Sequence, residues 1–252
     1  MNARPTLQQW LAREPFALAL SSGFFAFFAH AGMLSVLEQR GLLPVRISGS
    51  SAGALVGSLW AAGVDAATIA GELMHLRRSD FWDPAPGAGL LRGRLFRRRL
   101  QALLPVARFD ETRVPVAVSS YDLLRARTRV LERGELALAV CASCAVPLMF
   151  HPVWIERRPH LDGGIADRPG LAGMPHGTRL LFHHIASRSP WRTAGAMQIP
   201  TRPRMATLAI QGLPRVHPFA LQRGRVAFDR ARRATELALT QVVDDMRRVV
   251  LA

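Results

Sequence analysis

Cysteine is scarce in this chain, and its scarcity removes one class of site. Cys141 and Cys144 are the only cysteines, so no second pair exists to complete a tetrahedral zinc site. Their C-x-x-C spacing alone could indicate a redox or metal pair. Ala142, Ala145 and Val146 beside them are typical of an apolar core, where cysteine behaves as a small hydrophobic residue. We therefore expect a buried pair and a reducing, cytoplasmic location.

Lysine is absent, so every positive side chain other than histidine is an arginine. The 33 basic and 18 acidic residues give a formal net charge of +15. Such a charge attracts nucleic acid, phospholipid headgroups and acidic substrates alike. No segment has the basic and aromatic pattern of a nucleic-acid-binding motif, which argues against DNA or RNA as a partner. Most arginines are expected on a solvated face, and an anionic membrane surface stays open as a partner.

An uninterrupted membrane-spanning segment is also lacking. Phe16 to Leu37 contains no Asp, Glu, Lys or Arg, but Ser21-Ser22-Gly23 interrupts it. The part before this turn is too short for the core of a signal peptide. We interpret the run as a buried strand, a glycine turn and a buried helix. There are no internal repeats or low-complexity segments, and 252 residues with 49% hydrophobic composition predict a single globular domain.

Strand, turn and helix alternate in the first part of the chain. A strand is predicted at 16–20 and a helix at 27–40, then a strand at 45–48 and a helix reaching 62. This alternation predicts an α/β fold, a three-layer α/β/α sandwich around a mostly parallel sheet, with ligands at the carboxyl ends of the strands. Further expected elements are helices within 66–104 interrupted at 84–93, strands at 114–119, 128–131, 150–154 and 179–185, a helix at 136–145, and one or two closing helices over 226–250.

The first candidate for chemistry is Ser51, in the sequence Gly49-Ser50-Ser51-Ala52-Gly53. This G-x-S-x-G pattern follows an apolar strand and opens a helix, which is the context of a nucleophilic serine on a strained strand-to-helix elbow. Gly49 and Gly53 supply the small neighbours that such an elbow needs. The five-residue pattern is weak alone, because glycine and serine are common.

The second candidate is Asp162, in His160-Leu161-Asp162-Gly163-Gly164. A serine hydroxyl is a weak nucleophile until a nearby base accepts its proton, and Asp162 could be that base. The motif fits equally well an aspartate that caps the turn before Ile165. If the two residues form a catalytic unit, Ser51 Oγ and the Asp162 carboxylate should lie about 2.6 to 3.2 Å apart.

These segments together resemble the patatin-like phospholipases. The likeness runs from about Phe16 to Pro169, in the order and at the spacing of that family, and is weaker at 218–237. It rests on Leu18-Ala19-Leu20-Ser21-Ser22-Gly23, the G-x-S-x-G at Ser51, Ala142-Ser143-Cys144-Ala145-Val146-Pro147, and Asp162-Gly163-Gly164-Ile165-Ala166-Asp167-Arg168-Pro169.

The resemblance implies a calcium-independent lipid acyl hydrolase with a Ser51–Asp162 dyad, no cofactor and no metal. Phospholipid or another acyl ester would be the substrate, and no obligate protein partner is implied. Backbone N–H groups at Ser22, Gly23, Phe24 and Ala52 would form the oxyanion hole. The family's usual turn is Gly-Gly-Gly-x-Arg-Gly, whereas this chain has Ser22-Gly23-Phe24-Phe25-Ala26-Phe27. A lipid-binding or membrane-associated scaffold with impaired catalysis is therefore the alternative.

The acyl chain is expected in an apolar cleft near Phe24, Phe25, Phe28 and Leu55, although phenylalanine more often belongs to a core. Arg92 to Leu103 interleaves arginine with leucine and phenylalanine, which fits either a helix on an anionic bilayer or a surface helix packing its apolar face on the core.

The histidines are assigned no catalytic role. A Ser-Asp-His triad in an α/β-hydrolase fold requires several strands before the elbow, and only about 50 residues precede Ser51. His183 and His184 are expected to be structural residues at a strand end, and His30 to pack within the first helix. The dyad therefore remains the preferred interpretation.

Overall fold

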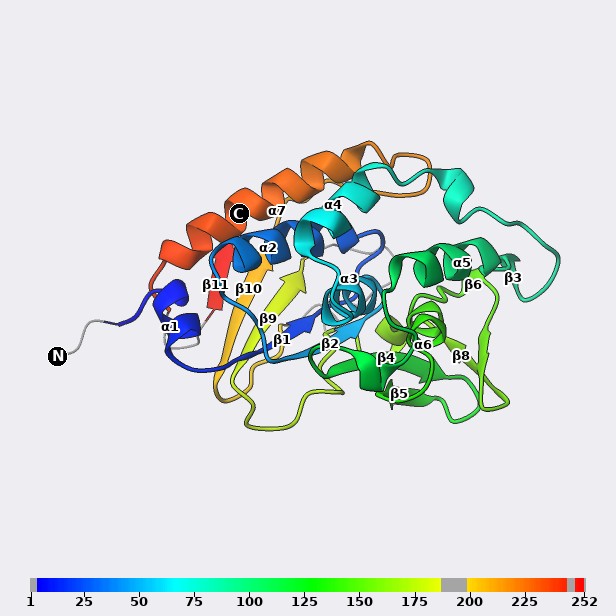
Figure 1. Ribbon diagram of the computed structural model, residues 1–252, viewed down its shortest axis with the longest axis horizontal. Coiled ribbons are helices and arrows are strands. Elements are labelled where there is room, and N and C mark those ends of the chain that lie inside the picture. The colour runs from blue at the N-terminus through cyan, green and yellow to red at the C-terminus, as the bar shows by residue number, and fades with distance from the viewer. Residues whose placement is uncertain (1–3, 187–198, 244–247, 252) are drawn as a thin grey trace.

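The computed structural model describes residues 4–186, 199–243 and 248–251, and its centre is a sheet with helices packed along it (Figure 1). The helices are α1 (Leu7–Arg13), α2 (Phe27–Gln39), α3 (Ala52–Ala61), α4 (Ala66–Met74), α5 (Arg94–Leu103), α6 (Leu136–Ser143) and α7 (Arg223–Thr240). The strands are β1 (Ala17–Leu20), β2 (Arg46–Ser50), β3 (Gly89–Leu91), β4 (Val116–Asp122), β5 (Arg127–Leu131), β6 (Leu148–Phe150), β7 (Val153–Ile155), β8 (Arg158–Leu161), β9 (Leu180–Ile185), β10 (Met205–Ile210) and β11 (Arg248–Leu251).

The main sheet has the strand order β11-β10-β9-β1-β2-β4-β8-β7, with β5 paired to β4, in the described part of the chain. Neighbours from β11 to β4 pair in parallel, whereas β5, β8 and β7 add antiparallel pairs. The predicted α/β class with a mostly parallel sheet flanked by helices is confirmed. Leu20 of β1 lies in register with Gly49 of β2. The turn after β1 and the elbow after β2 therefore lie side by side at the carboxyl edge of the sheet.

One face of the sheet carries the larger core. Leu18, Ile47 and Val118 from the strands join buried residues of α2, α3, α6 and α7 in one apolar cluster. α7 packs along α2 and also contacts α4, so α2 lies between other elements (Figure 1). The opposite face has a smaller cluster, in which Leu171 and Met174 pack against strand residues such as Phe182.

The long uncharged run is explained by burial. Every residue from Phe27 to Leu37 in α2 is buried, so this helix needs no polar face. The strand, turn and helix predicted for 16–40 are confirmed, and Gly41 with a φ of 66° follows the end of the helix. None of the described helices is both long and apolar enough to cross a membrane.

Three parts of the secondary-structure prediction were wrong. The strand expected at 150–154 is divided into β6 and β7, because Pro152 between them has no backbone N–H to donate to a ladder. Strands β3, β8 and β10 were not predicted. The closing helix ends at Thr240, and Arg248–Leu251 forms a strand parallel to β10 instead of continuing a helix. Residues 244–247 of the predicted range lie outside the described residues.

Candidate active site

Ser51 lies on a sharp turn between β2 and α3. It has φ 51° and ψ −117°, a backbone conformation that costs a non-glycine residue about 1–3 kcal/mol. Its N–H donates to Ser143 Oγ at 2.8 Å, and Ser143 Oγ donates in turn to the Ser119 carbonyl at 2.6 Å. These two hydrogen bonds, which link the elbow to α6 and α6 to β4, hold the elbow in its strained conformation.

The two glycines of the elbow are required by close backbone contacts. A Cβ on Gly49 would lie 2.6 Å from the carbonyl carbon of Gly53, and a Cβ on Gly53 would lie 2.2 Å from the Leu20 carbonyl oxygen. Both distances are far shorter than van der Waals contact. The helix α3 can therefore start directly against β1 and β2 only because these positions lack a side chain.

Ser51 and Asp162 are 111 positions apart in the sequence but in contact in the structure. Ser51 Oγ donates to Asp162 Oδ2 at 2.6 Å, which falls within the predicted range of separation. Ser51 is 9% exposed and Asp162 is 7% exposed. The hydroxyl and its acceptor are thus largely shielded from water, where an electrostatic interaction is stronger than in bulk solvent.

The Asp162 carboxylate both caps a turn and faces Ser51. Oδ1 accepts from the Gly164 N–H at 2.8 Å and caps the 3-10 turn Gly163–Ile165, while Oδ2 faces the serine. The Asp162 N–H donates to the Ala145 carbonyl at 2.9 Å. A Cβ on Gly163 would lie 2.1 Å from the Ser119 carbonyl oxygen. The glycines therefore let the turn come close to β4 and fix the orientation of the carboxylate.

The loop after β1 supplies two of the expected backbone donors, but not all three. The Ser22 N–H donates to the Arg168 carbonyl at 2.7 Å, so Ser22 is removed from the candidate oxyanion donors and instead anchors the loop. The N–H groups of Gly23, Phe24 and Ala52 donate to no acceptor among the described residues. Gly23, Phe24 and Ala52 also line the same cavity as Ser51.

Buried histidines lie behind this loop. His30 Nε2 lies 2.8 Å from the Ser21 carbonyl oxygen, and the Nδ1 atoms of His30 and His183 are 2.8 Å apart. Burial lowers the pKa of His30 to about 4 and that of His183 well below its ordinary value. Neutral His30 donates from Nε2 to Ser21, so His183 must donate from Nδ1. The expectation that these histidines are structural agrees with this geometry, which ties α2 to the ends of β1 and β9.

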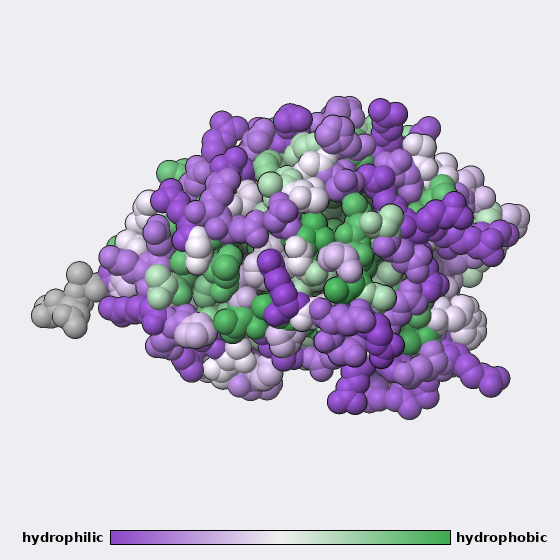
Figure 2. Space-filling view, in the orientation of Figure 1, coloured by the Kyte–Doolittle hydropathy of each residue, from purple (hydrophilic) through white to green (hydrophobic). Residues whose placement is uncertain are grey.

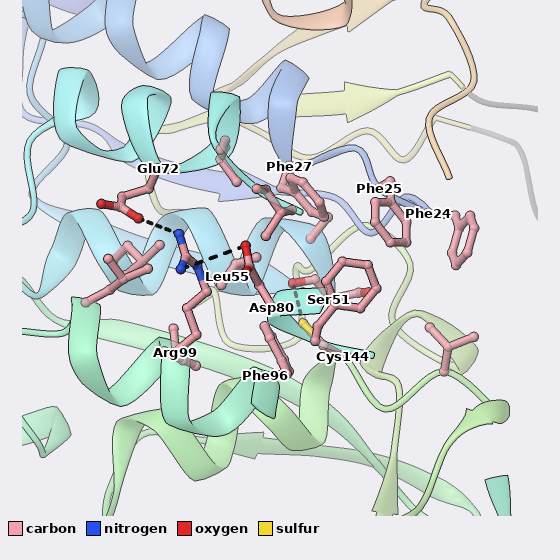
Figure 3. A pocket seen from close by; sticks show the side chains of 18 of the residues that line it. Phe24, Phe25, Phe27, Ser51, Leu55, Glu72, Asp80, Phe96, Arg99 and Cys144 are labelled. Atoms are coloured by element: carbon pink, nitrogen blue, oxygen red, sulfur yellow. Dashed lines mark hydrogen bonds and ion pairs between the residues drawn. The ribbon is translucent and has the colours of Figure 1, made fainter. Parts of the chain in front are cut away.

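An apolar cavity opens at Ser51. It has a volume of about 120 Å³, and its lining includes Phe25, Phe27, Leu55 and Leu73 (Figure 3). Figure 2 shows hydrophobic residues gathered around a hollow in the middle of one face, with hydrophilic residues around them. Such a cavity next to a serine hydroxyl fits a long apolar group attached to the reacting atom.

The predicted lining of the cleft is partly corrected. Phe24, Phe25 and Leu55 line the cavity as expected, but Phe28 is 1% exposed and belongs to the core. The arginine-rich segment forms α5, whose apolar side lines the cavity through Phe96 and other residues. α5 is thus a surface helix that packs its apolar side on the core, while Arg94 and Arg98 are exposed.

A charged group also borders the cavity. Arg99 of α5 forms an ion pair with Glu72 of α4 at 2.7 Å and lies 3.9 Å from Asp80 (Figure 3). These side chains are partly exposed, so their net contribution to stability is small, typically 0–1 kcal/mol for one pair. They bridge α4 and α5 on either side of the apolar cavity.

Two residues of the site had no assigned role in the sequence analysis. Ser143 positions the Ser51 backbone, as described above. Cys144 lines the cavity, and its thiol donates to the Ser51 carbonyl at 3.3 Å. Burial raises the pKa of Cys144 well above its ordinary value, which keeps the thiol protonated. Of the pair expected to be buried, Cys141 is buried in the core, whereas Cys144 is only partly buried. The segment containing Ser143 and Cys144 was visible as a motif, but nothing in a linear sequence shows that it faces the elbow.

A nucleophile elbow, an aspartate from a glycine turn and an apolar cavity at the edge of a mostly parallel sheet together define the class. The sequence profile described as "Patatin-like phospholipase" matches residues 18–173. The chain belongs to the patatin-like phospholipase family.

Individual relatives agree with this assignment. An uncharacterized NTE family protein of Mycobacterium bovis is 34% identical over 159 residues, which cover 60% of this chain and 43% of that protein. Neuropathy target esterase sws of Drosophila persimilis is 24% identical over 65% of this chain and 12% of its own length. The chain thus spans less than half of these relatives. The crystal structure of VipD from Legionella pneumophila shares the fold, with a TM-score of 0.66, 13% identity, and coverage of 95% of this chain and 71% of that one.

Proposed function

We propose that this protein is a serine acyl-ester hydrolase that cleaves acyl chains from phospholipids or lysophospholipids. Membership of the patatin-like phospholipase family supports lipid acyl hydrolysis. The observation that carries the proposal is the 2.6 Å hydrogen bond from Ser51 Oγ to Asp162 Oδ2 beside the apolar cavity.

Acylation begins at this hydrogen bond. Asp162 accepts the proton of Ser51 Oγ as the oxygen attacks the ester carbonyl. The tetrahedral intermediate then collapses, and Asp162 returns the proton to the departing alcohol oxygen. The other carboxylate oxygen stays bonded to the Gly164 N–H, so Asp162 does not rotate away between the two proton transfers.

The developing negative charge on the ester oxygen requires hydrogen-bond donors. We assign this role to the N–H groups of Gly23, Phe24 and Ala52. Ala52 is the first residue of α3, so its N–H carries the positive end of the helix dipole. Loss of one oxyanion donor typically lowers kcat about 100- to 1,000-fold. Because backbone donors do not depend on side-chain type, the loop sequence at Ser22–Phe27 is compatible with this role.

Deacylation reuses the same carboxylate. Asp162 accepts a proton from a water molecule that attacks the acyl-serine, and the returning proton regenerates the Ser51 hydroxyl. The acyl chain lies against the apolar walls of the cavity during both steps. The proton acceptor in this scheme is a carboxylate, so we propose that the reaction proceeds without calcium or a cofactor.

The rival proposal is a lipid-binding or membrane-associated scaffold. It is favoured by the departures at Ala26 and Phe27 from the family's turn, and by the φ of 53° at Phe25, an energetically costly value for a bulky residue. In either case we propose a cytoplasmic protein that associates peripherally with membranes.

A lipid panel separates the two proposals. The purified protein is incubated with phospholipids and lysophospholipids in the presence of a chelator, and released fatty acid is measured beside lipid binding. Ser51→Ala should abolish turnover and retain binding. Ser58→Ala, on the same helix, is the matched control and should turn over lipid like the wild type. Lipid binding without fatty acid release from the folded wild type would support the scaffold.

A further inference from the structure

A second cavity, of about 260 Å³, borders α5 next to the apolar cavity at Ser51, which we call the acyl cavity. Arg92, Arg94, Arg97, His151 and Trp154 are among the residues that line the second cavity. We call it the α5–β7 groove, because these residues come from α5 with its preceding turn and from the segment that leads into β7.

The groove and the acyl cavity share a wall. Phe96 of α5 and Phe150 of β6 line both, and their ring centroids are 6.2 Å apart. A molecule that reaches both cavities therefore needs a polar part and a long apolar part joined at this aromatic wall.

The positive charge of the groove is not fully compensated. Arg97 is bound to Glu135 through two hydrogen bonds, at 2.7 and 3.0 Å. Arg92 and Arg94 are exposed, and the guanidinium group of neither forms an ion pair within 4.0 Å with a carboxylate of any described residue. The start of α5 is not the source of this charge, because Asp83 accepts from the N–H groups of Gly93, Arg94 and Leu95. The two guanidinium groups remain for an outside anion.

Large exposed apolar side chains lie on β7, which lines the groove, and on the neighbouring strands β6 and β3. Trp154 is 64% exposed, and Leu148, which precedes Met149 of the acyl cavity, is 84% exposed. Leu90 of β3, the partner strand of β6, is half exposed. Exposed tryptophan and leucine beside arginines are typical of a surface that enters the headgroup region of a bilayer. A site for free phosphate would not need these apolar side chains.

We propose that the α5–β7 groove binds the phosphate of an anionic phospholipid in a membrane, through Arg92 and Arg94, while Trp154 and Leu148 enter the headgroup region. An acyl chain of a lipid held there reaches the acyl cavity across the Phe96–Phe150 wall. This proposal deepens the proposed hydrolase function. Cleavage of the bound lipid depends on that function, but binding of the lipid does not.

Binding is tested in Ser51→Ala protein, so that no lipid is consumed. Vesicles of phosphatidylcholine alone and vesicles containing phosphatidylglycerol are sedimented with the protein, and the bound fraction is measured. Tighter binding to the anionic vesicles is expected. Adding Arg92→Gln and Arg94→Gln should weaken that binding about five-fold per arginine, or roughly 25-fold together. Trp154→Ser should weaken binding to both kinds of vesicle.

The matched control removes the same charge elsewhere. Arg13 in α1 and Arg40 at the end of α2 are exposed and have no ion pair with any described residue. Arg13→Gln with Arg40→Gln should leave vesicle binding within about two-fold, because α1 and the end of α2 lie at the opposite end of the molecule from α5 (Figure 1) and charges farther than a Debye length are screened. Equal weakening by the two double variants would overturn the proposal, since net charge alone would then explain it. Thermal unfolding of each variant verifies that it is folded.

Two further measurements show whether the membrane assignment or the hydrolase proposal is at fault. Inorganic phosphate at constant ionic strength should not displace the protein from vesicles. If it binds in an Arg92- and Arg94-dependent manner while vesicles do not, the groove is a free-phosphate site and the membrane assignment is overturned. Labelling of wild-type Ser51 by a fluorophosphonate is measured in parallel. If Ser51 is not labelled but vesicle binding still depends on Arg92 and Arg94, the hydrolase proposal is rejected and the groove proposal stands.

Discussion

Ser143 offers the sharpest test of how the elbow is held. Its hydroxyl accepts from the Ser51 N–H and donates to the Ser119 carbonyl, at 2.8 and 2.6 Å. Ser143→Ala removes both bonds, and a buried N–H without an acceptor costs about 1–3 kcal/mol. In a domain of this size, 1 kcal/mol corresponds to roughly 2–4 °C, so Tm should fall by roughly 2–12 °C.

Ser58→Ala is the matched control for this substitution. Ser58 lies on α3, is fully buried, and its Oγ has no hydrogen-bond partner among the described residues. Removing that hydroxyl should leave Tm unchanged or slightly raise it. The two variants are compared by thermal unfolding and by the rate of fluorophosphonate labelling, which should slow only in Ser143→Ala because Ser51 loses its restraint. Indistinguishable Tm values and labelling rates for the two variants would refute the reasoning.

Two other perturbations have expected outcomes. Gly53→Ala places a methyl group 2.2 Å from the Leu20 carbonyl oxygen and should lower the free energy of unfolding, measured in urea, by about 1–3 kcal/mol. Gly71→Ala on α4 is the control: its Cβ would lie in open space, so this variant should raise the free energy of unfolding by about 0.5–1 kcal/mol. The reverse order of the two effects would contradict the packing argument. Burial lowers the pKa of His30 to about 4, so the unfolded state binds more protons below pH 6.5, and stability should fall by up to about 1.4 kcal/mol per pH unit between about pH 6.5 and 4. A flat profile of Tm against pH in that window would contradict a neutral buried His30.

Most of the parallel sheet could be predicted from the sequence, because its strands and helices are local and strongly apolar. Ala17–Leu20, followed by α2 and the elbow at Ser51, is legible as alternating strand and helix signals. Strands β3, β8, β10 and β11 were missed. Arg158–Leu161 contains a proline and a histidine and carries no alternating pattern, and its pairing with β4 and β7 is set by tertiary contacts.

The candidate residues of the site could be selected from the sequence, but their supporting contacts could not. Ser51 and Asp162 stand in recognisable motifs, and the two interpretations of Asp162 turned out to be compatible, one for each carboxylate oxygen. The role of Ser143 depends on a packing of α6 against the elbow that no local pattern encodes. Ser22 was misassigned because a loop sequence does not show which N–H is already bonded.

The residues that line the cavity were also predictable only in part. Phe24 and Phe25 could be assigned to the cleft because they follow β1 at the edge where ligands bind. Within the first turn of α2, Phe27 lines the cavity, whereas Phe28 points into the core and is 1% exposed. The phase of α2 against the sheet decides between the two environments, and that phase is not visible when a helix is apolar on every side.

The central claim is that Asp162 activates Ser51. Fluorophosphonate labelling followed by mass spectrometry of the folded protein measures this directly, because the reagent reacts only with an activated serine. We predict modification at Ser51 in the wild type and a rate at least about 100-fold lower in Asp162→Asn. Absence of modification in the folded wild type, or equal rates in the two proteins, would contradict the account.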